Sequence, residues 1–385
     1  MAFEPMDDLR ANVRALAERF ALARDERLRR TALDPQDFAR LGEAGFRLTG
    51  IAAAYGGVWR GLARSVRDYC EIIRDLARAD PSLALVASMH PAVLAFWLAA
   101  EKVEHDDAAW QRQRNQWFDS ALGGHWWGTL MSEPGSGGDL AATRTRAVAA
   151  GNAWRLTGEK HFGSGSGITS FMLTIARADG DESPDLFVID TRGRPADGSA
   201  GIKLTKPWDG YGMMATQSHA FRLDACPATR AASRDALAVA APIVMQLAPM
   251  LFSAVIVGVL DVAIEAARAI ARPRAERLRA YERVAFAESA NEVWLAQQAY
   301  EGAIGTIERG EEGAIAAARA KLTIASLAET AIARLTRVVG GGSYARESPF
   351  GQWLQDVRAL GLLRPPWGLA YDQLLALDLD VSASP

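Results

Sequence analysis

The sequence predicts an α+β protein of three domains: an N-terminal helical lobe, a middle antiparallel β-domain and a C-terminal helical bundle. Alanine- and leucine-rich segments with helical spacing fill both ends of the chain, whereas the middle alternates short strand-type segments with glycine-rich turns. A chain of 385 residues is long enough for two or three domains. We therefore expect domains at 1–124, 125–230 and 231–385.

The first domain, residues 1–124, is predicted to be mainly helical. Two helix-start signals support this, because Asp34 precedes Pro35 and Asp80 precedes Pro81. Apolar residues recur near helical spacing in the first segment at Leu9, Val13, Leu16, Phe20 and Leu22.

Residues 125–230 change to short alternating segments with turn signals between them. The acidic stretch Ala178–Asp185 is predicted to be one of the connecting loops. Strands are expected at Thr145–Ala149, Trp154–Thr157, Phe171–Ile175, Leu186–Ile189 and His219–Leu223. Together they predict a small antiparallel sheet.

From about Ala231 the chain is predicted to be helical to its end, with a break at the three glycines 340–342. The segment Ala236–Leu260 carries no charged residue and is long enough to cross a bilayer. It contains two prolines, however, and runs into an amphipathic stretch. A helix buried on all sides in a bundle or a subunit interface gives the same pattern. We therefore expect no membrane span.

Composition argues against several classes of function. The net charge is −3 and no block of like charge is present, so a nucleic-acid partner is not expected. Cys70 and Cys226 lie far apart, which is typical of reduced thiols in a cytoplasmic protein. The start of the chain lacks the apolar core of a signal peptide. The five histidines show no metal-ligand spacing, so no metal is expected.

Two motifs in the middle domain suit a flat or anionic ligand. Ser132–Asp139 reads SEPGSGGD, and its glycines allow backbone N–H groups to approach a ligand closely. Leu156–Ser164 reads LTGEKHFGS and places Phe162 two residues before a hydroxyl. Hydroxyl groups therefore occur in both motifs, at Ser132 and Ser164.

Together the motifs resemble those of the acyl-CoA dehydrogenase superfamily, in which a Thr/Ser-Glu-Pro-Gly-x-Gly-Ser-Asp loop precedes a Leu-Asn-Gly-x-Lys-x-(aromatic)-x-Thr/Ser segment. The resemblance implies a helical lobe, a β-domain and a four-helix bundle. It also implies an oxidoreductase that binds FAD, with FMN as the alternative, and that assembles as a homotetramer. Its partners would be a small-molecule or carrier-bound acyl substrate and an electron-transfer partner or flavin reductase.

The resemblance assigns flavin contacts to particular residues. The serines would bind the polar edge of the ring, the aromatic residue would stack on it, and the loop would approach it closely. These residues are Met131, Ser132, Gly137, Phe162 and Ser164.

The adenine end of FAD would be held partly by a neighbouring subunit, through Arg272, Arg337, Gly340 and Gly341. This sequence departs from the family there. Only Arg272 remains of an Arg-x-Thr-Phe-Gly segment, and Arg337 replaces a glutamine, although it could pair with pyrophosphate oxygens.

The usual catalytic base is missing. Where the family often has a glutamate, this sequence has Arg364, and a guanidinium is not a usable base near neutral pH. An alternative base position in the family aligns with Ala248, which has no carboxylate either. His90 is therefore the leading candidate base, because an imidazole titrates in the useful range. The alternative is that His90 is a satisfied core residue. Arg364 would bind an anionic substrate group.

Three functions remain open at this point. The first, which the resemblance favours, is FAD-dependent desaturation of the CH–CH group of an acyl thioester with a non-standard base. The second is a monooxygenase of the same fold, in which the flavin arrives reduced and reacts with oxygen in a shaped, water-poor pocket. The third is a flavin-binding scaffold without turnover, against which Ser132 and Ser164 argue mildly.

Overall fold

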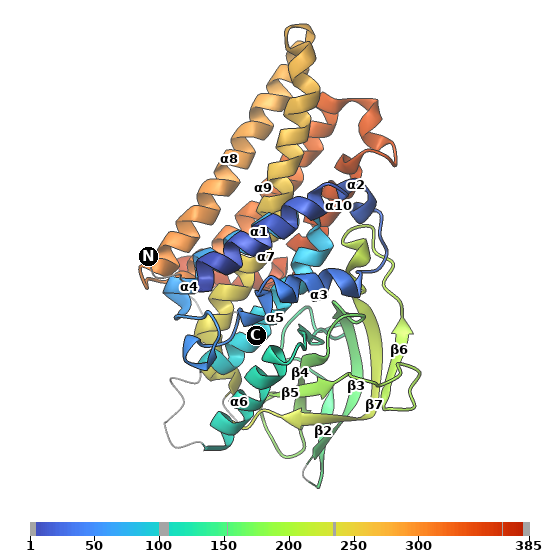
Figure 1. Ribbon diagram of the computed structural model, residues 1–385, viewed down its shortest axis with the longest axis vertical. Coiled ribbons are helices and arrows are strands. Elements are labelled where there is room, and N and C mark those ends of the chain that lie inside the picture. The colour runs from blue at the N-terminus through green and yellow to red at the C-terminus, as the bar shows by residue number, and fades with distance from the viewer. Residues whose placement is uncertain (1–4, 100–107, 152, 234–235, 364, 380–385) are drawn as a thin grey trace.

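A computed structural model describes residues 5–99, 108–151, 153–233, 236–363 and 365–379. Its helical N-terminal lobe, β-domain and C-terminal bundle follow one another in the predicted order (Figure 1). The long helices of the bundle extend along the long axis of the molecule, and the β-domain lies at the other end (Figure 1).

The N-terminal lobe begins its helices where the sequence predicts. The carboxylate of Asp34 accepts a hydrogen bond from the N–H of Gln36 at 2.9 Å, and that of Asp80 accepts one from Leu83 at 2.9 Å. Both predicted helix starts are thus confirmed. The lobe comprises α1 (Pro5–Ala21), α2 (Arg24–Leu28), α3 (Pro35–Glu43), η1 (Phe46–Leu48), η2 (Ala53–Tyr55), α4 (Leu62–Ala79), α5 (Pro81–Leu98) and α6 (Ala108–Leu122).

The β-domain is a sheet that closes on itself. Its strands are β1 (Trp127–Thr129), β2 (Arg146–Ala150), β3 (Ala153–Gly163), β4 (Phe171–Ala178), β5 (Asp185–Asp190), β6 (Ile202–Lys206) and β7 (His219–Arg230). The order is β1-β4-β2-β3-β7-β5, with β6 on β7, and β5 also pairs with β4 to complete a ring. Because side chains alternate along a strand, one set fills the interior of the ring with residues such as Leu156, Phe187 and Leu223.

The sheet differs from the prediction in two respects. Most pairings are antiparallel, but β4 pairs in parallel with β1 and β2. Strand β6 was not predicted from the sequence, since only two of its five residues are apolar. The five predicted strand segments each overlap an observed strand, and four lie fully within one, whereas Thr145 precedes the start of β2 by one residue.

The C-terminal domain packs around one long apolar helix. Its elements are α7 (Ala236–Ala271), η5 (Arg272–Arg277), α8 (Ala280–Glu308), α9 (Gly313–Val339), η6 (Gly341–Tyr344), α10 (Pro349–Gly361) and α11 (Trp367–Asp378). Helix α7 contacts α4, α5, α8 and α9. Asp261 follows the charge-free segment and is also buried, where it accepts hydrogen bonds from the guanidinium of Arg74 at 2.7 and 2.9 Å.

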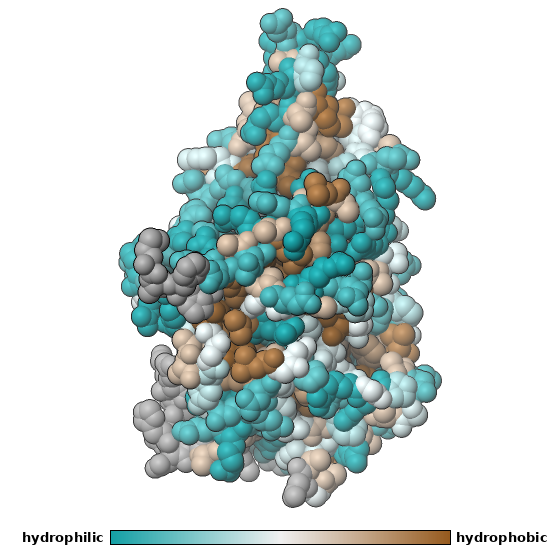
Figure 2. All heavy atoms as spheres, in the orientation of Figure 1, coloured by the Kyte–Doolittle hydropathy of each residue, from teal (hydrophilic) through white to brown (hydrophobic). Residues whose placement is uncertain are grey.

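Two described helices have the length and composition of a membrane span. The apolar window of α5 is fully buried inside the protein, and 72% of the window in α7 is buried. Both are therefore core helices in this fold. The face drawn in Figure 2 is mostly hydrophilic, with apolar atoms in separate patches.

Candidate functional site

A cavity of about 480 Å³ lies between the β-domain and helices α5, α7, α10 and α11. We call its two sides the sheet wall and the helix wall. The sheet wall carries hydroxyl groups and comprises Thr129, Met131, Ser132, Gly138, Asp139, Leu140, Phe162, Ser164, Trp208, Met213 and Ser218. The helix wall is almost entirely apolar and includes Leu85, Val93, Phe96, Ala248, Phe252 and Leu363.

The structure brings four of the predicted flavin contacts together. These are Met131, Ser132, Phe162 and Ser164, which all line the sheet wall. Gly137 does not line the cavity, but the next residue does. Gly138 has φ +89°, and a Cβ there would lie 2.6 Å from Cγ of Pro366. A residue without a side chain thus lets the glycine-rich loop meet the start of α11.

A buried ion pair anchors the first motif from behind. Lys160 Nζ donates to Glu133 Oε1 at 2.7 Å and to the carbonyl oxygen of Ile175 at 2.6 Å. Glu133 also accepts hydrogen bonds from the Thr145 hydroxyl at 2.6 Å and the Arg144 N–H at 2.7 Å. Burial alone would raise the pKa of Glu133, but these hydrogen bonds lower it to about 2. The charged pair therefore ties the loop of the first motif to the strand that carries the second.

The second motif reaches the cavity through an irregular turn of backbone. The N–H of His161 donates to the carbonyl oxygen of Ser132 at 2.8 Å. Phe162 has φ +58° and sits where β3 shifts its register against β7. Such a conformation is unfavourable for an aromatic residue, and a bulge redirects a side chain. The Phe162 ring consequently lines the cavity, with its centroid 6.0 Å from that of Trp208.

His90, the leading candidate base, is buried in the N-terminal lobe and does not line the cavity. Its Nδ1 accepts a hydrogen bond from the Trp127 N–H at 3.3 Å, so its Nε2 donates to the carbonyl oxygen of Arg47 at 3.1 Å. Burial lowers the pKa of His90 to about 4. A neutral imidazole with both nitrogens engaged is suited to a core position, and this geometry argues against the base role. Arg364 lies outside the described residues.

A second buried lysine holds the helix wall. Lys321 on α9 donates to the carbonyl oxygens of Gly361 at 2.7 Å, of Leu363, and of Pro365 at 3.0 Å. Burial lowers the pKa of Lys321 to about 7, yet three acceptors require the three donors of the charged ammonium. Gly361 ends α10, so the cation also lies at the negative end of that helix dipole. Lys321 therefore fixes the cavity-lining segment between α10 and α11.

A buried carboxylate joins the two walls. Asp356 on α10 accepts hydrogen bonds from the N–H of Met213 at 2.6 Å and from the side-chain amide of Gln352 at 2.8 Å. Burial raises the pKa of Asp356 to about 7. Met213 lines the cavity and has φ +53°. Asp356 thus holds a turn of the β-domain against α10.

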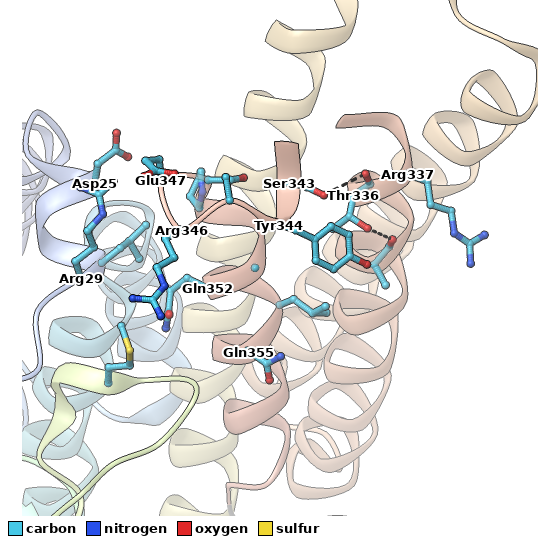
Figure 3. Close-up of a pocket in the computed structure, with 18 residues that line it drawn as sticks. Asp25, Arg29, Thr336, Arg337, Ser343, Tyr344, Arg346, Glu347, Gln352 and Gln355 are labelled. Atoms are coloured by element: carbon cyan, nitrogen blue, oxygen red, sulfur yellow. Dashed lines mark hydrogen bonds between the residues drawn. The ribbon is translucent and has the colours of Figure 1, made fainter. Parts of the chain in front are cut away.

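The four residues expected at the adenine end do not line the cavity. They are Arg272, Arg337, Gly340 and Gly341. They lie at the start of η5 and around the end of α9, and these two regions are linked because Arg274 donates to the carbonyl oxygen of Val338. Arg337 lines a separate groove of about 1080 Å³ with Arg29 and Arg346, but its side chain points away from theirs (Figure 3).

The cavity fits a flavin ring. A flat heterocycle with one polar edge requires apolar cover on its faces and hydrogen-bonding groups along that edge. The sheet wall provides both, since Phe162 and Trp208 supply aromatic cover and Ser132 and Ser164 supply hydroxyls. A side chain at position 138 would narrow this space, as the contact of Gly138 with α11 demonstrates.

Sequence reasoning missed several residues that line or support this site, among them Trp208, Ser218, Thr216, whose hydroxyl lies 2.7 Å from that of Ser218, and Lys321. One signal was present for the last. Only five of the 43 Lys and Arg residues are lysines, and two of these, Lys160 and Lys321, are fully buried. In a chain that otherwise uses arginine, a lysine can mark a position that needs a compact cation with three donors. The hydroxyl residues gave no comparable signal.

Comparisons with known proteins agree with this architecture. Three family models match the chain in order: the acyl-CoA dehydrogenase N-terminal domain over residues 4–114, the middle domain over 128–226 and the C-terminal domain over 245–364. Probable acyl-CoA dehydrogenase FadE25 of Mycobacterium tuberculosis is 26% identical over 371 residues, which cover 92% of this chain and 90% of the relative. Acyl-CoA dehydrogenase FadE34 of the same organism is 35% identical over 104 residues, which cover 26% of this chain and only 14% of FadE34.

Solved structures of different activities share the fold. KijD3, in complex with FMN and a dTDP-linked sugar, has a TM-score of 0.81 at 21% identity, with 99% of this chain and 95% of KijD3 covered. Butyryl-CoA dehydrogenase from Megasphaera elsdenii has a TM-score of 0.80 at 17% identity, covering 98% and 100%. Methanesulfinate monooxygenase MsuC from Pseudomonas fluorescens has a TM-score of 0.77 at 20% identity, covering 100% and 98%. With its three matched domains and this fold, the chain belongs to the acyl-CoA dehydrogenase family of flavin-dependent oxidoreductases.

Proposed function

We propose that this protein is a monooxygenase that takes up a reduced flavin and oxygenates a small apolar molecule in the cavity. The observation that carries the proposal is the chemistry of the lining. Among the described residues that line the cavity there is no histidine, glutamate, lysine or arginine, and the one carboxylate is that of Asp139. Removing an α-proton needs a base within hydrogen-bond reach, whereas oxygenation needs a shaped pocket that excludes water.

The residues of the two walls would divide the work. The chemistry that a bound flavin supplies is the two-electron activation of oxygen and transfer of one oxygen atom. Ser132 and Ser164 would bind the polar edge of the ring, while Phe162 and Trp208 cover it. The helix wall would exclude water and orient an apolar substrate, since side chains such as Phe96 offer only van der Waals contact.

Acyl-thioester desaturation is the second candidate. It is favoured by FadE25, which matches nearly the whole chain. In the described part of the lining, Asp139 is the carboxylate that would have to take the proton. Its Oδ1 already accepts a hydrogen bond from the N–H of Ala141 at 2.8 Å, so this oxygen is engaged by the backbone of its own loop.

The cofactor follows from the same geometry. FAD was expected from the sequence, with FMN as the alternative, but the adenine-end residues do not line the cavity. We propose that a single chain holds the FMN half, and that FAD binding requires a second copy to supply Arg272 and Arg337. Exposed apolar residues on α8, such as Trp294 and Tyr281, are compatible with the homotetramer that the family resemblance implies. Flavin released from purified protein and separated by chromatography identifies the cofactor, and light scattering gives the subunit number.

One pair of measurements tests the reaction. The protein with bound flavin is mixed with acyl-CoA compounds without oxygen, and the absorption of the oxidised flavin is followed. In parallel, the protein is supplied with NADH, FMN and a flavin reductase, and oxygen uptake is measured with apolar test substrates such as indole. Substrate-dependent oxygen uptake with an oxygenated product in the mass spectrum supports the proposal. Bleaching by acyl-CoA without such uptake establishes the second candidate, and bound flavin with neither response indicates a scaffold.

A further inference from the structure

Three hydroxyl groups form a chain that begins at the cavity and ends on a backbone carbonyl. Ser164 Oγ lies 2.8 Å from Ser218 Oγ, which in turn lies 2.7 Å from Thr216 Oγ1. Thr216 Oγ1 also lies 2.8 Å from the carbonyl oxygen of Met213. Ser164 and Ser218 line the cavity, whereas Thr216 is fully buried.

Each hydroxyl has one proton to donate, so the chain has two arrangements. In the first, Thr216 donates to Met213 and Ser218 donates to Thr216. Ser164 then donates to Ser218 and offers only lone pairs to the cavity, so that a ligand atom there must be a donor. In the second, Thr216 donates to Ser218 and Ser218 donates to Ser164. Ser164 then donates to the cavity, and the ligand atom must be an acceptor.

The two arrangements differ by one hydrogen bond. The carbonyl oxygen of Met213 keeps two other donors in both, the N–H of Thr216 at 3.2 Å and Nε1 of Trp208 at 3.0 Å. The second arrangement therefore leaves no buried acceptor unpaired, but it lacks the bond from the Thr216 hydroxyl to this carbonyl. One net hydrogen bond of ordinary strength corresponds to roughly two- to tenfold in affinity. The hydroxyl chain consequently favours a ligand that donates a hydrogen bond to Ser164.

We propose that this hydroxyl chain biases the cavity towards the reduced form of its flavin. The inference rests on the proposed function, because it takes a flavin to be the ligand that Ser164 meets. Reduction converts a ring nitrogen of a flavin from a hydrogen-bond acceptor into an N–H donor. The first arrangement, which has the additional hydrogen bond and needs a donor in the cavity, therefore matches the reduced ring. Such a bias suits a protein that receives its flavin already reduced from a partner reductase.

Thr216→Val tests the chain, because valine keeps the shape and removes the hydroxyl. The first arrangement would then leave the proton of Ser218 without an acceptor, so the preference moves to the second. The dissociation constants of oxidised and dithionite-reduced FMN are measured by equilibrium dialysis without oxygen. We expect the preference for reduced over oxidised FMN to fall by roughly two- to tenfold relative to the unmodified protein.

Thr49→Val is the matched control, since it removes an equally buried hydroxyl that donates to a backbone carbonyl, at 2.7 Å from that of Phe46, but lies outside the cavity lining. Its preference ratio should equal that of the unmodified protein. Ser218→Ala provides a second variant if Thr216→Val does not fold, and it should lower the ratio because Ser164 loses its partner. Unchanged ratios in the chain variants, or an equal change in the control, would overturn the inference. If neither form of FMN binds the unmodified protein, the proposed function fails instead.

Discussion

The two walls of the cavity are held by the same kind of cation in different ways. Behind the sheet wall, Lys160 pairs with the carboxylate of Glu133. Behind the helix wall, the described partners of Lys321 are backbone carbonyls alone. A buried charge is costly unless it is paired or fully hydrogen-bonded, so the two lysines satisfy the requirement by different routes. The wall that we assign to the flavin is fixed by side chains, and the wall that we assign to the substrate is fixed by the course of the backbone.

Breaking the ion pair should have the largest effect. In Glu133→Gln the ammonium of Lys160 stays buried without a countercharge, which should lower the free energy of unfolding by about 3–5 kcal/mol. FMN binding should weaken as well, because Ser132 directly precedes the anchor. Urea unfolding and FMN titration measure the two effects. Glu159→Gln is the control, since the partner of this exposed carboxylate among the described residues is the exposed Arg222 at 3.1 Å, and its loss should change the free energy of unfolding by less than about 1 kcal/mol. Equal losses in both variants would contradict the assignment.

Removing the other lysine should have a smaller and more local effect. Lys321→Met leaves carbonyl oxygens of the segment between α10 and α11 without their donor, at a cost of about 1–3 kcal/mol. We expect faster amide hydrogen exchange in that segment and weaker binding of indole, with FMN affinity unchanged within about twofold. Hydrogen-exchange mass spectrometry and dialysis measure these quantities. Lys203→Met, on exposed β6, removes the same charge and should alter none of them. Exchange that rises uniformly over the whole chain would indicate a general loss of stability and not a local one.

Acid should remove the advantage of the ion pair. The pKa of Glu133 is lowered to about 2 in the folded protein from an ordinary value of 4.5. The stabilisation that the Glu133 carboxylate adds to the free energy of unfolding is therefore complete above the ordinary pKa, and it is lost as the pH falls from there towards 2. The difference in unfolding free energy between the unmodified protein and Glu133→Gln should shrink over that range, because a protonated glutamate resembles glutamine. Denaturant unfolding at a series of pH values measures it. A difference independent of pH would mean that the charge of Glu133 is not what matters.

The smallest effect is expected at His90, which belongs to neither wall. Burial lowers the pKa of His90 to about 4 from the ordinary 6.5. Its nuclear magnetic resonance signals should therefore stay constant as the pH falls from neutrality through 6.5, and change only as the pH approaches 4. Below that value the unfolded chain binds the proton more readily, so the contribution of His90 to stability falls as the pH drops towards 4. His90→Gln should leave FMN affinity unchanged within about twofold. If His90 titrated near the ordinary pKa and His90→Gln lost flavin binding, His90 would have to be assigned a role in the site.

The sheet wall could be predicted because its motifs are continuous in sequence. Ser132–Asp139 and Leu156–Ser164 carry the ion pair and five of the residues that line the sheet wall, namely Ser132, Gly138, Asp139, Phe162 and Ser164. The resemblance of these motifs to the acyl-CoA dehydrogenase superfamily was what assigned Met131, Phe162 and Ser164 to one surface, and all three line the cavity. Their individual roles toward a flavin stay predictions.

The helix wall could not be predicted in the same way. Helices α5 and α7 are apolar on nearly all sides, so their periodicity does not reveal which face turns to the cavity. Met89 lines the cavity while its neighbour His90 contacts the carbonyl of Arg47 on another side. The acceptors of Lys321 are backbone oxygens, which every residue type possesses. Such a site leaves no signature in the order of side chains.

The burial of Lys160 and Lys321 has a practical consequence for handling the protein. Within the described part of the chain, the remaining lysines are Lys203 and Lys206, both exposed on β6. Amine-directed labels should therefore spare Lys160 and Lys321, which support the interior, and react with Lys203 and Lys206 on this edge strand.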